Sequence, residues 1–164
     1  MMIVHEGTPD EPGVDENMVA YAAGLFDGEG CILITHYKFL RGRNCCRWRM
    51  SAFITNTNPR PLILCKQLFG GSVFSKIKSA PEKNHRAQWK WEVHSRAGFN
   101  FLKKILKYSI IKKDEIIKAL EFGSTIHEKR GGKRQLSNED TAHRHAIKKE
   151  LSDLKRREYV DLPC

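Results

Sequence analysis

Two acids, Asp27 and Glu29, alternate with glycine in the segment Asp27-Gly28-Glu29-Gly30. The apolar residues from Val19 to Phe26 predict a helix before it, and the paired glycines predict that this helix stops at the segment. A helix ending there would present a carboxylate, and two such helices side by side would bring two carboxylates together. Oxygen donors of this kind are the ligands that hard divalent cations prefer. A solvated acid in a helix-ending turn is the alternative for Glu29.

One face of the expected helix carries small or short side chains at i, i+3, i+4 and i+7. Small side chains let two helix backbones approach closely, so this face is a candidate dimer interface. Its members are Ala20, Ala23, Gly24 and Asp27. The larger side chains, which we expect to pack on a sheet, are Met18, Tyr21, Leu25 and Phe26. For Asp27 we predict a structural role, accepting hydrogen bonds at the helix contact or turn, with no metal ligation.

The rest of the chain must position this segment. Asp15 is the expected N-cap of a helix that starts at Glu16. Asn58 is the expected N-cap of a second helix, which follows it directly, and Ser137 that of the last helix in the chain. Alternating residues predict strands over 31–37, 47–55, 73–78 and 88–94, and apolar spacing predicts further helices over 95–106 and 112–122. The order α-β-β-α-β-β-α-α predicts an α+β fold, with an antiparallel four-stranded sheet and helices on one of its faces.

Alternation along the strands assigns the two faces of this sheet. Trp48, Trp89 and Trp91 share the parity of apolar neighbours, so we expect them in the core and not stacked on bases. The opposite parity is rich in Arg, Lys and Gln, and it is free to meet a ligand. Together with the basic turn, the candidate ligand-binding residues of this face are Leu33, Thr35, Tyr37, Arg41, Arg43, Arg47, Arg49, Ser51, Phe53, Phe74, Lys76, Lys78, Gln88 and Lys90.

Charge indicates the class of partner. The 164 residues carry a net charge of +10, distributed unevenly. Residues 1–30 contain seven acids and no Lys or Arg, whereas residues 31–126 contain 19 basic and 5 acidic residues. A centre this basic favours a polyanion, most often nucleic acid, over a soluble protein that merely has a high pI. We expect a loose acidic arm (1–14), one main domain (15–126), and a basic linker with a C-terminal helical extension (127–164).

Several protein classes are disfavoured by composition. The longest apolar runs are far too short to cross a bilayer, and the first residues lack the features of a secretory signal. The five cysteines form no C-x-x-C pair, which argues against a zinc finger and a disulfide scaffold. We therefore expect an intracellular protein with no membrane partner and no small-molecule substrate, in an organelle, a phage-infected cell or a prokaryotic cytoplasm.

The run Ala22-Ala23-Gly24-Leu25-Phe26-Asp27-Gly28-Glu29-Gly30 resembles the motif that names the LAGLIDADG homing endonucleases. It departs from that motif mildly, with Ala22 in place of Leu and Glu29 in place of the second Asp. The element order, the basic strands and the Asn58-Pro59-Arg60 segment strengthen the resemblance, which covers about residues 16–126.

The resemblance implies a site at the end of the motif. Glu29 is the expected metal ligand and Gly28 offers a nearby carbonyl. Asn56, Arg60 and Lys112 match positions of active-site polar or basic residues, with a turn Asn and helix-surface cations as the plainer alternatives. Mg²⁺ is the implied cofactor, with Mn²⁺ able to substitute and Ca²⁺ binding with little or no cleavage.

A single copy of the motif resembles the family members that act as homodimers. The implied function is site-specific cleavage of double-stranded DNA at a long pseudo-palindromic target, of the homing type, by metal-assisted phosphodiester hydrolysis. Two alternatives remain. One is a DNA- or RNA-binding protein on the same fold that does not cleave, such as an intron maturase or a transcription regulator. The other is a basic protein of unrelated α+β fold.

Overall fold

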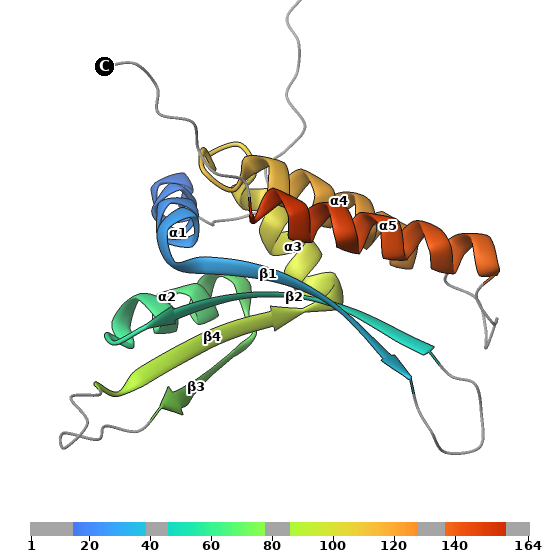
Figure 1. Cartoon of the computed structure of the whole chain (residues 1–164). Coiled ribbons are helices and arrows are strands. Elements are labelled where there is room, and N and C mark those ends of the chain that lie inside the picture. The colour runs from blue at the N-terminus through green and yellow to red at the C-terminus, as the bar shows by residue number, and fades with distance from the viewer. Residues whose placement is uncertain (1–14, 39–45, 78–85, 128–136, 157–164) are drawn as a thin grey trace, which may run out of the picture.

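The structure is a computed structural model of the chain, and it describes residues 15–38, 46–77, 86–127 and 137–156. The described elements follow the expected order (Figure 1). The helices are α1 (Glu16–Glu29), α2 (Arg60–Phe69), α3 (Ser95–Ile105), α4 (Lys113–His127) and α5 (Asn138–Leu154). The strands are β1 (Gly30–Lys38), β2 (Cys46–Asn56), β3 (Ser72–Ile77) and β4 (Gln88–His94). The predicted fold class is therefore confirmed.

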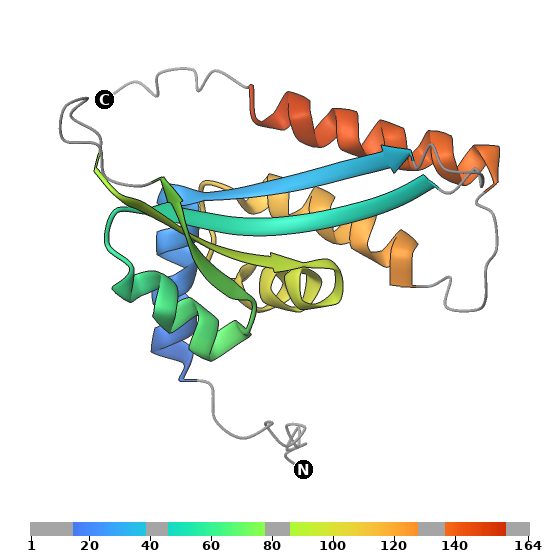
Figure 2. The same cartoon turned by 90° about the horizontal axis from the view of Figure 1, so that it is seen from below.

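The four strands form one antiparallel sheet in the order β1-β2-β4-β3. Gly30 pairs with Ile54, and Asn56 pairs with Trp89. This register puts the start of β1, the end of β2 and the start of β4 at the same end of the sheet. Figure 1 shows the helices on one side of the sheet, with the opposite side open. In Figure 2, α5 runs beside the edge strand β1.

The core lies between the sheet and the helices and is built from alternate strand residues. Ile32, Met50, Ile54 and Trp91 are at most 1% exposed and face the helices. Trp48 and Trp89, half-buried, pack against the same cluster. The expectation that the three tryptophans belong to the core is confirmed, because the period-2 alternation of these strands places them on the covered face.

The helix α1 is longer than expected, because it continues through Gly28 and ends at Glu29. Asp15 caps its start as expected, accepting a hydrogen bond from the Asn17 amide at 2.9 Å. The chain then turns directly into β1 at Gly30, whose amide donates to the Phe26 carbonyl. A Cβ at Gly30 would lie 2.3 Å from the Phe26 ring, so only glycine allows this close approach.

The C-terminal helix α5 is joined to the same core. Its Ile147 and Leu151 are 1% and 3% exposed and belong to the main apolar cluster. Arg144 is buried and donates to the Thr125 carbonyl at 2.8 Å and to its hydroxyl at 3.2 Å, near the end of α4. Burial lowers the pKa of this guanidinium. The helix α4 continues to His127, and α5 packs on the same core as the elements between residues 15 and 127.

Two expected segments, the acidic arm (1–14) and most of the basic linker, lie outside the described residues. Within the described ranges, no helix combines the length and apolar character needed to cross a membrane.

Candidate active site

Asp27 connects the end of α1 to the turn between α3 and α4. Its carboxylate accepts hydrogen bonds from the Ser109 hydroxyl and from the amides of Ile110 (2.7 Å), Ile111 (3.1 Å) and Lys112 (3.1 Å). Successive backbone amides at a helix N-terminus are a preferred environment for an anion. Burial raises the pKa of Asp27, but these hydrogen bonds outweigh it and hold the pKa below the ordinary value of 3.8. The structural role predicted for Asp27 is confirmed.

Glu29 has the opposite surroundings. Its side chain is exposed at the corner between α1 and β1, and it makes no hydrogen bond or ion pair with another described residue. The pairing of Gly30 with Ile54 places this corner beside the end of β2. The carboxylate is therefore free to bind a ligand at the edge of the sheet where β1 starts and β2 ends.

The donor chemistry of this corner suits a hard divalent cation. A carboxylate oxygen from Glu29 and a backbone carbonyl at the exposed Gly28 are oxygen ligands, and the C-terminal end of a helix carries a partial negative charge. The described residues contain no group of three or more His, Cys, Asp or Glu that could hold a metal alone. Among the described residues, this corner therefore offers the Glu29 carboxylate and the Gly28 carbonyl as oxygen donors.

Lys112 is brought to this end of α1 by the turn that Asp27 holds. Its ammonium donates to the Asp27 carbonyl at 2.7 Å, and its backbone amide donates to the Asp27 carboxylate. Lys112 is one of the basic residues implied by the resemblance. Its ammonium lies at the last turn of the motif helix, on the carbonyl of the residue that precedes Gly28.

Asn56 and Arg60 lie on the connection from β2 to α2. The Asn56 side-chain oxygen accepts from the Asn58 amide at 2.8 Å, and the Asn58 oxygen accepts from the Arg60 amide at 3.0 Å. The helix α2 begins at Arg60 with Pro59 as its N-cap residue, so the expected cap at Asn58 is shifted by one residue. The Asn58 and Asn56 oxygens are instead both engaged in the turn before the helix. The Arg60 side chain is exposed. The described contacts do not join either side chain to Glu29, so their active-site roles remain predictions.

The expected dimer face of α1 needs correction. Ala23 and Asp27 are 0% and 7% exposed and face the interior of the chain, so they cannot meet a second copy. Gly24 is exposed and Ala20 half-buried. The exposed face instead includes Met18 and Tyr21, at 40% and 49% exposure, which were expected to pack on the sheet. The inward stripe is set by Val19, Ala22, Ala23, Phe26 and Asp27, because these follow the helical repeat of 3.6 residues.

The open face of the sheet presents cations and large apolar groups. Arg47 and Arg49 are exposed, as are Leu33, Tyr37 and Phe74, in line with their predicted parity. Ser51 is an exception: it is 3% exposed and shares a 2.8 Å hydrogen bond with His94 Nδ1, so it is not accessible.

Other predicted members of this face have partners or lie outside the description. The Lys90 ammonium is 3.1 Å from a Glu92 oxygen and 4.0 Å from the centre of the Phe53 ring, so it is already held within the sheet. The Thr35 hydroxyl donates to the Arg49 carbonyl, and Gln88 is half-buried. Lys76 lies on β3, but its side chain is outside the described part, as are Arg41, Arg43 and Lys78 altogether.

Two contributors near the motif were missed. Ser109 donates to Asp27, and only the approach of a turn 82 residues away in sequence brings it there. Lys155, just after α5, donates to the Ile32 carbonyl on the outer edge of β1 and lies 3.5 Å from the Cys31 sulfur. No local pattern signals either contact, because both depend on tertiary packing.

Neither a family model nor a curated protein sequence matches the chain. Solved structures do. The archaeal intron-encoded homing endonuclease I-Vdi141I, complexed with DNA, is 17% identical at a TM-score of 0.69, covering 90% of both chains. The homing endonuclease I-CvuI, in complex with its target in the presence of Ca, is 16% identical at a TM-score of 0.67, covering 90% of this chain and 87% of that one. The chain has the fold of the LAGLIDADG homing endonucleases.

The likeness to a third structure differs in extent. The LAGLIDADG homing endonuclease I-SmaMI, bound to cleaved DNA, is 15% identical at a TM-score of 0.62. The match covers 88% of this chain but 47% of I-SmaMI. At such identities the shared property is the LAGLIDADG fold, in which Asp27, Gly28 and Glu29 end the first helix.

Proposed function

We propose that this chain forms a homodimeric, divalent-metal-dependent, site-specific DNA endonuclease. The observation that carries the proposal is the division of the two motif acids. Asp27 is fully engaged in holding the turn before α4, whereas Glu29 is exposed without a partner among the described residues. The neighbours of this fold described as bound to DNA or to cleaved DNA support the substrate class.

In this proposal two copies bring two Glu29 carboxylates together over one duplex. A bound divalent cation would supply water activation and stabilisation of the leaving oxygen in phosphodiester hydrolysis. Glu29 and the Gly28 carbonyl would hold it, with Mg²⁺ as the working ion and Ca²⁺ as a poor substitute. Asp27 and Lys112 keep the end of α1 in place, and Arg47 and Arg49 on the open face bind the duplex.

The exposed face of α1 supports the dimer. Gly24 and Gly28 have no atom within 4 Å of a hypothetical Cβ, so packing inside this chain does not require glycine there. Glycine within a helix costs roughly 0.5–1 kcal/mol relative to Ala. A second copy packed closely on this face explains why small residues stand beside the exposed Tyr21. The match to about half of I-SmaMI is in keeping with two copies forming the complete assembly.

Light scattering of a helix variant tests the dimer. Gly24→Leu adds bulk to the exposed face and should convert a particle of twice 18.9 kDa into one of 18.9 kDa. Ala146→Leu, at an exposed site on α5, is the matched control and should leave the mass unchanged. A dimer that persists in Gly24→Leu would remove α1 as the interface.

Cleavage is tested in two steps, because the target must first be found. Duplexes from a randomised pool are selected for binding in Ca²⁺, cloned into a plasmid, and incubated with the protein in Mg²⁺ or with EDTA. We expect Mg²⁺-dependent cuts in both strands at one pseudo-palindromic site. Specific binding without cuts in Mg²⁺ or Mn²⁺ would instead identify a DNA-binding protein that does not cleave. Absence of any specific binding would mean that the sheet is not a DNA surface.

A further inference from the structure

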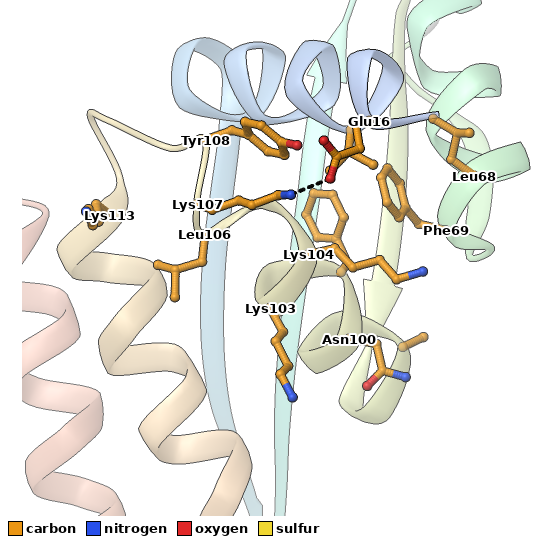
Figure 3. A pocket seen from close by; sticks show the side chains of 13 residues that line it. Glu16, Leu68, Phe69, Asn100, Lys103, Lys104, Leu106, Lys107, Tyr108 and Lys113 are labelled. Atoms are coloured by element: carbon orange, nitrogen blue, oxygen red, sulfur yellow. Dashed lines mark hydrogen bonds and ion pairs between the residues drawn. The ribbon is translucent and has the colours of Figure 1, made fainter. Parts of the chain in front are cut away.

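An open groove of about 1180 Å³ lies among the helices, on the side of the molecule away from the open sheet face (Figure 3). It is bounded by the first turns of α1, the end of α2, and α3 with the residues that follow it. Leu68, Phe69 and Leu106, all half-buried, contribute apolar surface to its lining. Lysines from α3 and the following turn surround that surface. The groove thus combines an apolar floor with a cationic rim.

The cations of this rim differ in their partners. The Lys107 ammonium is 2.6 Å from a Glu16 carboxylate oxygen, an ion pair that crosses from the turn after α3 to the start of α1. Figure 3 shows Lys107 turned toward Glu16, while Lys103 and Lys104 leave α3 in other directions. Both of these are exposed, and neither makes an ion pair with a carboxylate of the described residues. The rim of the groove therefore has two ammonium groups that could form ion pairs with additional carboxylates.

The chain itself contains a segment of matching chemistry next to the groove. Residues 1–14 lead directly, through Asp15, to the groove residue Glu16. They contain three acids (Glu6, Asp10 and Glu11), no Lys or Arg, and an apolar run over 1–4. Fourteen residues span at most about 50 Å, which is ample for a segment anchored at the groove. Tethering also gives the segment an effective concentration on the order of millimolar.

We propose that residues 1–14 dock in this groove, with Asp10 and Glu11 against Lys103 and Lys104 and the apolar residues 1–4 over Leu68 and Phe69. Docking covers apolar surface and offsets positive charge on the helical side. The open sheet face then remains the main cationic surface of the molecule. The inference does not depend on the proposed endonuclease activity, and its test does not use DNA.

Zero-length carbodiimide cross-linking of the full-length protein tests the contact, since it joins carboxylates to ammonium groups only when they touch. Mass spectrometry should find links from Asp10 or Glu11 to Lys103 or Lys104. Their yield should be at least tenfold above links to Lys148 and Lys149, an adjacent exposed pair on α5 that serves as control. Equal yields at the two pairs would show that the segment does not dock and would overturn the proposal.

A charge swap separates specific docking from proximity. Lys103→Glu with Lys104→Glu should abolish the links, and adding Asp10→Lys with Glu11→Lys should restore them with the polarity reversed. Failure of the swap to restore the links would contradict the pairing. A mixture of ¹⁵N-labelled and unlabelled protein identifies the occupant. Links that join a labelled to an unlabelled chain would mean that a second copy fills the groove, and would overturn docking within one chain.

Discussion

Asp27 and Glu29 are two residues apart in the last turn of α1, yet they lie in opposite environments. Asp27 is 7% exposed and accepts hydrogen bonds from a hydroxyl and three successive amides. Glu29 is exposed and makes no contact of this kind with the described residues. Two steps along an α-helix turn a side chain by about 200°, so neighbouring acids with this spacing necessarily point to opposite sides.

The difference shows how one short segment can do two jobs. The inward acid fixes the helix end against the turn before α4, and Lys112 reinforces that contact from the other direction. The outward acid is left available at a corner that the inward one keeps rigid. A ligand-binding carboxylate is better positioned when its support comes from a separate, fully hydrogen-bonded group.

The largest expected effect is on the outward acid. Glu29→Gln keeps the shape and removes the charge that would hold a cation, so cleavage of the selected target in Mg²⁺ should fall at least about a thousandfold. DNA affinity and the urea midpoint should stay close to wild type, because the side chain is exposed. Cleavage at the wild-type rate by this variant would eliminate Glu29 as a metal ligand.

The inward acid should show the reverse pattern. Asp27→Ala leaves several donors at the α3–α4 turn without their acceptor, and the free energy of unfolding should fall by about 3 kcal/mol. Urea denaturation measures this loss, with Glu29→Ala as the matched control at less than about 0.5 kcal/mol. Equal losses of unfolding free energy in the two alanine variants would show that Asp27 and Glu29 do not differ in their structural role.

Acid should selectively remove the contribution of Asp27. Its folded pKa lies below the ordinary value of 3.8, so the folded chain binds fewer protons here than the unfolded chain. The stabilisation is therefore fully present above about pH 4 and is lost as pH falls through the folded pKa. The difference in unfolding free energy between wild type and Asp27→Asn should shrink from pH 5 to pH 3. A difference that does not change over this range would argue against the assigned hydrogen bonds.

A smaller effect is expected at Lys112. Lys112→Met removes the ammonium that donates to the Asp27 carbonyl at the negative end of α1, at a cost of about 1 kcal/mol. Lys113→Met, at the exposed neighbouring position, is the control and should be nearly neutral. If Lys112 also acts on DNA, cleavage at a temperature where both variants are folded should drop about tenfold or more in Lys112→Met alone. Identical cleavage by the two variants would limit Lys112 to the structural role.

Much of the fold could be predicted from the local pattern of apolar and polar residues. Strand parity placed Trp91 and Met50 inside and Arg47 and Arg49 outside, because alternate residues of a strand point to opposite faces. The predicted assignment of the two faces of α1 was wrong, because side-chain size was a poor guide in this helix. Small residues occur all around this helix, so size alone did not reveal that Ala23 faces inward and Tyr21 outward.

The sequence by itself determined the order of elements, the parity of the strands, the caps at Asp15 and Ser137, and the segment that ends α1. These depend on interactions within a few residues of one another, whose energies are set by local geometry. Only the tertiary structure decided that Ser109 and Lys112 meet Asp27, that α5 completes the core, and that Ser51 is closed by His94. Those contacts join residues 43 to 85 positions apart or bury a whole helix face, and they form only where the packing of the sheet and helices brings the backbones together.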